Sequence, residues 1–327
     1  MIKILILVLV LLITIPSLAK ENEMESQISY SKHADLVFHV LAYMRVNNAS
    51  NLHCEEYIET MSTKRGDFDF DLVSRLREIE DYYNNNFGRL AMINFYPLVS
   101  QDFDDLKNRL LNHQGFSPDD MTYFINPFIE ILEKEATFFF DYWERLHAQN
   151  EDFRNIIEER LRVELRKYNR IFEHFNKPPI AILSYKISRN GRGIKNDNYF
   201  HAAIRFPDSE ADFYHSFFML LHEYTHAFTD DLIGTNINMQ DGSHMLSEKL
   251  VLLADYWLVR AIDYERLPYY MRMFFRLDFD SLPPEVRESP DFDMQIENQL
   301  LGSLNIDDDL LKRLRNLIDE ILENVVE

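Results

Sequence analysis

The chain has 327 residues, a formal net charge of −21 and a hydrophobic fraction of 46%. This length and composition fit a globular protein of one large or two small domains, with ample apolar residues for a core. The acidic balance argues against nucleic acid and anionic lipid surfaces as partners, since neither is attracted to a strongly acidic protein, and it slightly favours a cationic peptide or protein.

The first nineteen residues have the layout of a secretory signal. Lys3 precedes an apolar run at 4–15, and small residues stand at Ser17 and Ala19, the two positions that a signal peptidase recognises. An uncleaved anchor is the alternative, but the run is shorter than the ~20 residues that span a bilayer. Cys54 is the single cysteine, which excludes an intrachain disulfide. The sequence therefore predicts a protein that is secreted or located in the periplasm or cell envelope of a bacterium, with no membrane contact beyond the signal segment.

Residues 20–148 are expected to form a helical N-terminal portion. Apolar residues recur there at spacings of three and four, which is typical of helices with one buried face. The apolar segment 87–99 fits a strand or a buried helix equally well and stays unassigned. The expected elements are helices at 30–47, 71–83 and 102–112, and a helix that begins at Ser117-Pro118.

Residues 149–327 combine helices with a small sheet. The expected elements are a long helix at 149–175, strands at 180–187 and 199–206, and helices that begin at 208 or 209, at 243 and at 307. The segment between the two strands contains Gly191 and Gly193 and is interpreted as a turn or loop. No stretch is composed like a flexible linker. The sequence thus predicts one compact α+β unit that is mostly helical.

The helix that follows the second strand carries an H-E-x-x-H string from His222 to His226. Positions four apart lie one above the other on a helix, so both imidazoles can reach one metal ion. Glu223 lies beside the metal in such an arrangement, where it can accept a proton from water as a general base. The alternative is a solvated helix face that binds nothing. The apolar stripe on the opposite side of the helix argues against ordinary core histidines.

A zinc ion at this motif requires a third protein ligand and an open position. Glu248, near the start of the next expected helix and 22 residues after His226, is the best candidate, and His244 is the alternative. Asp230 lies on the same helix as the histidines and would leave little room for a substrate. Asp255, two turns after Glu248, can hold the second nitrogen of one histidine. A simple solvent-facing role for Glu248 remains the other hypothesis.

The H-E-x-x-H string, a glutamate on a later helix, and the preceding helix and two strands resemble the gluzincin group of zincin metallopeptidases. The similarity extends over about 149–263, and it is greatest to poorly characterised secreted bacterial zincin-like families. It implies a zincin-like core with one Zn²⁺ held by His222, His226 and Glu248. Glu223 would then be the base in the hydrolysis of a peptide or protein substrate.

The resemblance also implies that the strand before the motif helix is the sheet edge that binds extended substrate, with His201 and Ala203 lining it. A tyrosine is expected to stabilise the oxyanion, and the candidates are Tyr256, Tyr264, Tyr269 and Tyr270. The chain departs from better-known gluzincins at Leu252, where an aspartate is usual. Two other hypotheses stay open: a zincin fold kept for binding with a structural or vestigial metal, and an accidental motif. The accidental motif predicts Glu248 more than ~10 Å from the histidines.

Overall fold

The structure is a computed structural model that describes residues 26–44, 55–65, 70–187, 190–233, 243–302 and 308–323. The predicted signal segment and Cys54 lie outside the described residues. Among the helices that are described, none combines the length and apolar character required to cross a bilayer.

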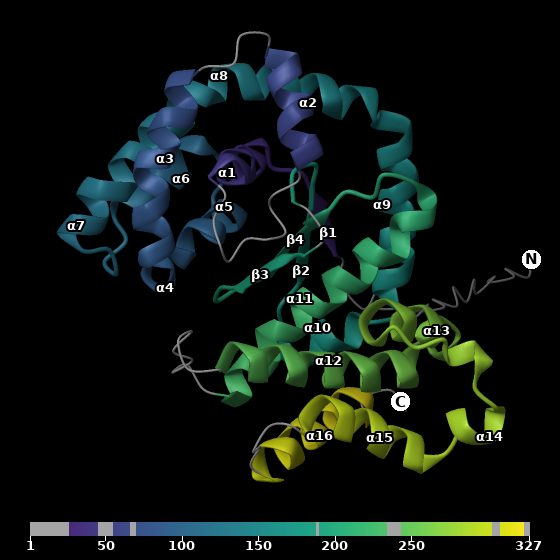
Figure 1. Cartoon of the computed structure of the whole chain (residues 1–327). Coiled ribbons are helices and arrows are strands. Elements are labelled where there is room, and N and C mark those ends of the chain that lie inside the picture. Colours follow the sequence, from purple (N-terminus) through teal and green to yellow (C-terminus); the bar gives the residue numbers. More distant parts are fainter. Residues whose placement is uncertain are drawn as a thin grey trace, which may run out of the picture.

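A four-stranded sheet lies at the centre of the molecule (Figure 1). Its strand order is β1-β2-β4-β3, in which β1, β2 and β4 run parallel and β3 runs antiparallel to β4. The strands are β1 Gln27–Ser29, β2 Pro179–Ser184, β3 Arg192–Lys195 and β4 Phe200–Arg205. The two predicted strands are thereby confirmed. The sequence did not predict β1, and β3 lies where a loop was expected.

The sheet separates two hydrophobic clusters because successive side chains of a strand point to opposite faces. Ile182 and Ala203 face the N-terminal helices, whereas Ala181 and Ala202 face the helices of the C-terminal half. In Figure 1 the helices α1 to α8 accordingly lie above and to the left of the sheet, and α10 to α16 lie below it. The N-terminal portion also contributes β1 to the sheet, which joins the two halves through backbone pairing.

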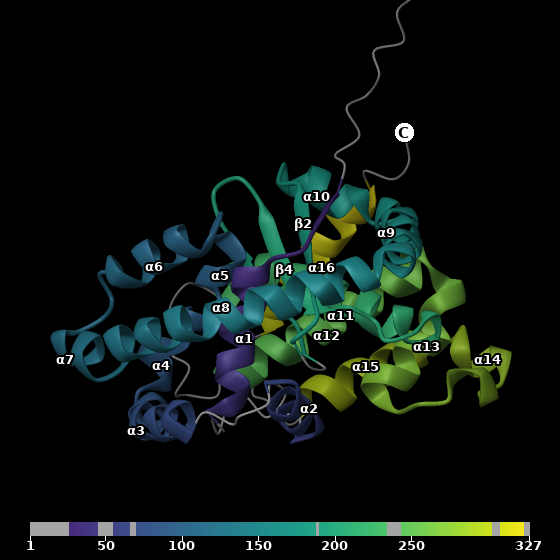
Figure 2. The same cartoon turned by 90° about the horizontal axis from the view of Figure 1, so that it is seen from above.

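The N-terminal half is helical, as predicted, and 87–99 forms short helical turns rather than a strand. Ser117 begins the expected helix with a capping box, in which Asp120 N donates to the Ser117 hydroxyl. Seen from above, α8 runs from near α7 towards α9 (Figure 2). The helices are α1 Lys32–Tyr43, α2 Glu55–Arg65, α3 Phe70–Asn85, α4 Phe87–Leu90, α5 Tyr96–Val99, α6 Phe103–Leu111, α7 Pro118–Asp120 and α8 Asn126–Gln149.

The C-terminal half contains the long elements that were predicted, with one break. The helices are α9 Glu151–Arg166, α10 Asn169–Phe175, α11 Phe213–Ile233, α12 Ser243–Ile262, α13 Leu267–Tyr270, α14 Pro284–Arg287, α15 Pro290–Leu301 and α16 Asp308–Glu323. The expectation of a single helix at 149–175 is wrong. Lys167 and Tyr168 donate to carbonyls three residues back, and this tightening ends α9 and turns the ring of Tyr168 into the core. Ile156 of α9 lies on the outer side of the helix and is 46% exposed.

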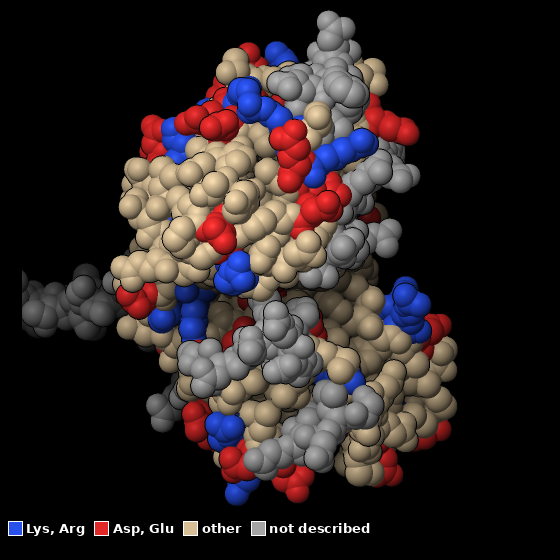
Figure 3. Space-filling model, turned by 60° about the vertical axis from the view of Figure 1, so that its left-hand side comes forward, with Lys and Arg blue, Asp and Glu red and all other residues tan. Residues whose placement is uncertain are grey.

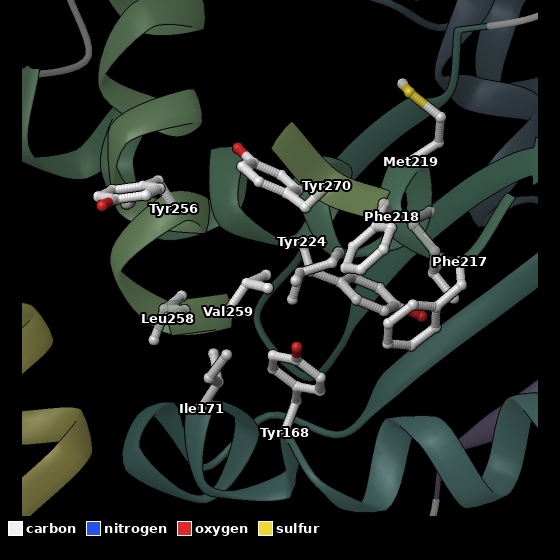
Figure 4. Packing of buried hydrophobic residues seen from close by; sticks show 14 of the residues in the cluster. Tyr168, Ile171, Phe217, Phe218, Met219, Tyr224, Tyr256, Leu258, Val259 and Tyr270 are labelled. Atoms are coloured by element: carbon white, nitrogen blue, oxygen red, sulfur yellow. The ribbon is translucent and has the colours of Figure 1, made fainter. Parts of the chain in front are cut away.

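The predicted apolar stripe of α11 packs into the core of the C-terminal half. Phe217, Phe218 and Tyr224 lie close to Tyr168 and Tyr270, and all five are nearly or fully buried (Figure 4). The tightly packed rings fix the rotation of α11 about its axis. On the molecular face in Figure 3, basic and acidic side chains of the described residues are interspersed, and the surface is hollowed between the upper and lower halves.

Candidate metal centre

The two motif histidines lie on the side of α11 that faces α12. His222 is 5% exposed, because α12 packs along α11 and covers this side of the helix. The ring of Phe274 stacks on the imidazole of His222, with the ring centroids 5.6 Å apart. The histidine face is therefore enclosed by protein, while the Glu248 side chain keeps 39% of its surface exposed and connects the cluster with solvent.

His222, His226 and Glu248 form a group whose ligand atoms all lie within 4.8 Å of one another. Glu248 Oε2 is 3.3 Å from His222 Nε2, and Glu248 Oε1 is 3.5 Å from His226 Nε2. The accidental-motif hypothesis predicted a separation of more than ~10 Å between Glu248 and the histidines, and the observed distances contradict that separation. The three residues that the sequence singled out as ligands are brought together by α11 and the first turns of α12.

The two nitrogen-to-oxygen distances are compatible with a small metal ion, and zinc is one example. Zinc bonds of about 2.0–2.2 Å in a tetrahedral arrangement place ligand atoms about 3.3–3.6 Å apart. Both nitrogen-to-oxygen distances fall in this interval. Two imidazoles and a carboxylate are also a donor set that zinc accepts in sites that keep a fourth, open position.

The second nitrogen of each histidine is held by a polar side chain. His222 Nδ1 lies 3.0 Å from Asp255 Oδ2, and the Thr225 hydroxyl donates to Asp255 Oδ1 at 2.5 Å. Asp255 is fully buried. When the imidazole is neutral, a buried carboxylate at Nδ1 keeps the proton on that nitrogen, so Nε2 is the nitrogen that can bind a metal. The contact expected of Asp255 is thus present in the structure, and Thr225 is an additional partner that the sequence did not reveal.

The contacts of His226 Nδ1 are longer than the contact of His222 Nδ1. Its Nδ1 lies 3.2 Å from the Ser247 hydroxyl and 3.6 Å from Asp230 Oδ1, and Ser247 donates to Asp230 at 2.6 Å. Asp230, considered as a ligand from the sequence, therefore lies on the Nδ1 side of the ring, away from the group formed by the Nε2 atoms. Its role is to orient His226 together with Ser247.

The carboxylates around the histidines shift their protonation strongly. Burial by itself lowers the pKa of His222, but hydrogen bonds with Asp255 and Glu248 outweigh burial and raise it to about 9. Burial also lowers the pKa of His226, but hydrogen bonds with Asp230 and Glu248 outweigh burial and raise it to about 10. Burial raises the pKa of Glu248, but the hydrogen bonds and charges of the two histidines lower it by more, so the net shift is downward. Negative charge is thus concentrated where a cation would lie.

Glu223 lies against the edge strand β3. A Cβ atom added at Gly191 would lie 2.4 Å from Glu223 Cγ, and one at Gly193 would lie 2.7 Å from the Glu223 carbonyl oxygen. Real Cβ atoms do not approach other atoms so closely, so a larger residue at either position would force Glu223 or the strand to move. Burial raises the pKa of the Glu223 carboxyl, which favours proton uptake there. The two glycines were interpreted as turn residues. Their i, i+2 spacing, which puts both on one strand face, is the signal that could have revealed the contact.

The structure contradicts the predicted substrate edge. β4 is an interior strand between β2 and β3, and His201 and Ala203 are both buried. His201 Nε2 contacts the Asn196 amide, and Ala203 packs on the cluster of the N-terminal half. The edge of the sheet next to α11 is β3.

Tyr256 is also misassigned as an oxyanion candidate. Its hydroxyl donates to Asp293 of α15 and accepts from Arg260, and its ring points away from α11 (Figure 4). The reason is helical geometry: one residue after Asp255 is about 100° around α12. Tyr270, another candidate, donates its hydroxyl to the Leu252 carbonyl. The side chain of His244, the alternative ligand, lies outside the described residues.

Comparison with known proteins gives no relative: no family model, curated protein or solved structure matches the chain. The chemistry of this centre is therefore argued from its residues alone.

Proposed function

We propose that the protein is a zinc-dependent metallopeptidase that hydrolyses peptide bonds. The observation that carries the proposal is the convergence of His222, His226 and Glu248 beside Glu223, on two adjacent helices. His222, His226 and Glu248 would hold one zinc ion. The ion, when bound, would polarise the carbonyl of the scissile bond and acidify a water molecule.

The residues of the chain supply the remaining parts of the reaction. Glu223 accepts a proton from the attacking water and passes it to the leaving amine, a task that suits a half-buried carboxyl with a raised pKa. Asp255 and Thr225 fix the ring of His222, while Ser247 and Asp230 fix that of His226.

The edge strand β3 provides a place for an extended peptide. Among the described strands, β3 pairs only with β4. The backbone N–H and C=O groups on its other side can therefore pair with an added peptide strand. Gly191 and Gly193 bring this strand directly against Glu223. A peptide paired with β3 would therefore pass beside the proposed base. With residues 1–19 as a signal segment, we place the enzyme in the bacterial envelope or outside the cell.

Replacement of Glu223 by glutamine tests the proposal. The wild type, loaded with one equivalent of zinc, is expected to cleave members of a fluorescence-quenched peptide library. Glu223→Gln should bind zinc as tightly but lose at least ~100-fold in turnover, since a general base contributes about 10²–10⁴-fold. Glu164→Gln, a buried glutamate of α9 that contacts Tyr214 and Lys167, is the control and should keep its activity.

Two results would count against hydrolysis. Cleavage by Glu223→Gln at the wild-type rate would remove the mechanism. A zinc-loaded wild type that cleaves no peptide of the library would favour the alternative hypothesis, a binding protein with a structural metal site.

A further inference from the structure

A second group of buried ionisable side chains lies away from the metal centre, on the other face of the sheet. A cavity of about 390 Å³ opens there at the carboxyl ends of β2 and β4, between α2 and α8. Ligand pockets of α/β proteins commonly occur at such strand ends, and this volume falls within their usual range of roughly 300–1,000 Å³. None of the residues that line the cavity belongs to the metal centre.

Five of the twelve described residues that line the cavity are aromatic, and the one buried charge among them is Lys186. The aromatic residues are Tyr57, Tyr142, Phe153, Tyr185 and Phe206. The other cation of the lining, Arg205, forms an ion pair with Asp208 next to it.

Lys186 is 8% exposed, and its ammonium group lies among rings. The nitrogen is 4.6 Å from the ring centroid of Tyr142, 4.7 Å from that of Tyr57, and 3.3 Å from the Tyr142 hydroxyl. Lys64 adds a second positive charge, 5.0 Å from the Tyr142 ring centroid. Within the described part of the chain, no carboxylate forms an ion pair with Lys186.

Asp35, the carboxylate whose charge acts on Lys186, is already engaged. Asp35 accepts hydrogen bonds from the Trp143 indole, the Ser184 hydroxyl and the Tyr185 backbone amide. Asp35 therefore acts on Lys186 through its charge, but it forms no direct ion pair with the lysine in the described part of the chain. A buried cation without a direct ion pair is costly, and binding of an anion would relieve that cost.

The protonation state of Lys186 agrees with such a role. Burial lowers its pKa to about 8, and the charge of Asp35 limits the shift. Most molecules therefore carry the ammonium form at neutral pH.

We propose that this cavity is a binding site for a small organic carboxylate, whose carboxylate pairs with Lys186 and whose apolar body packs against the aromatic walls. Among the described residues, Lys186 is the one lysine that lines the cavity, since Lys64 is exposed and lies outside the lining. One lysine matches one negative charge, whereas a phosphate dianion is better served by several cations or by the fork of an arginine. Arg205, the other cation of the lining, already pairs with Asp208, which makes it a poorer partner for a second anion. The site is independent of the proposed hydrolysis.

Calorimetric titration of the full mature chain with matched ligands tests the proposal. The probes are phenylacetate, 4-phenylbutyrate and decanoate, each compared with its neutral amide. At least one carboxylate is expected to bind with a dissociation constant below ~1 mM and at least tenfold more tightly than its amide. Amides that bind as tightly as the acids, or no binding by any of the three acids, would overturn the proposal.

Lys186→Met assigns the charge dependence to its residue. Methionine keeps an apolar stem of similar length, so the variant should fold, and the preference for the acid over the amide should disappear. Lys134→Met, an exposed lysine of α8, is the matched control and should keep it. A folded Lys186→Met protein that retains the tenfold preference would contradict the assignment. If that variant does not fold, the wild-type comparison of acid and amide decides alone. Zinc binding should be unchanged in both variants.

Discussion

Asp255→Asn is the substitution that probes the support of the metal centre most sharply. The Asp255 carboxylate joins α12 to α11 by accepting from His222 Nδ1 at 3.0 Å and from Thr225 at 2.5 Å, in a fully buried position. Asparagine has nearly the same shape, but it is neutral and offers one acceptor oxygen instead of two. One of the two contacts must therefore be lost or inverted, and His222 loses the negative charge that makes it a better zinc ligand.

The expected loss of zinc affinity is about 10–100-fold, the usual effect of removing such a partner from a metal-bound histidine. This corresponds to about 1.4–2.8 kcal/mol of binding free energy. The assay is competition for zinc against a chromophoric chelator, with the unfolding midpoint of the metal-free protein measured in parallel. Asp263→Asn is the control, because Asp263 is also a buried acid near the end of α12 but pairs with Lys167 instead of a histidine.

An unchanged zinc affinity in a folded Asp255→Asn protein would refute this account of His222. An equal loss in Asp263→Asn would show that the effect comes from general destabilisation. Only a selective loss in Asp255→Asn supports the specific contact.

Two further predictions concern the strand next to Glu223 and the protons at the site. Gly191→Ala should keep zinc and lose about 100-fold in turnover, because a Cβ atom 2.4 Å from Glu223 Cγ forces Glu223 to move by about 1 Å. Gly88→Ala is the control and should be neutral, because there is open space around its Cβ. Full activity of Gly191→Ala would contradict the contact. Zinc binding near pH 7 should release protons, because His222 and His226 have pKa values raised to about 9 and 10 in the metal-free protein and must lose their Nε2 protons to bind. Calorimetry in buffers of different ionisation enthalpy measures this release. The zinc affinity should also rise with pH between 6 and 8. A heat of zinc binding that is independent of the buffer would show that the histidines are already neutral before zinc binds.

The sequence predicted the parts of the centre that depend on helical periodicity. His222 and His226 are four residues apart, and Glu248 and Asp255 are seven apart, so each pair lies on one face of its helix. In the structure, Glu248 and Asp255 both contact His222. The same rule, applied one residue further, would have excluded Tyr256.

Features that depend on strand pairing were not predictable in this way. β3 has four residues and contains a glycine, so its composition resembles a loop, and its position at the sheet edge follows from pairing with β4 rather than from its own sequence. The assignment of His201 and Ala203 to the edge failed for the same reason. β1 is only three residues long, and its partner β2 lies more than 150 positions away.

Zinc analysis of purified protein tests the central claim most directly. After removal of loosely bound metal, the wild type is expected to retain one zinc ion per chain and His226→Ala none, with both proteins folded. A wild type that retains no stoichiometric zinc, or a His226→Ala protein that retains as much as the wild type, would contradict a metal centre formed by His222, His226 and Glu248.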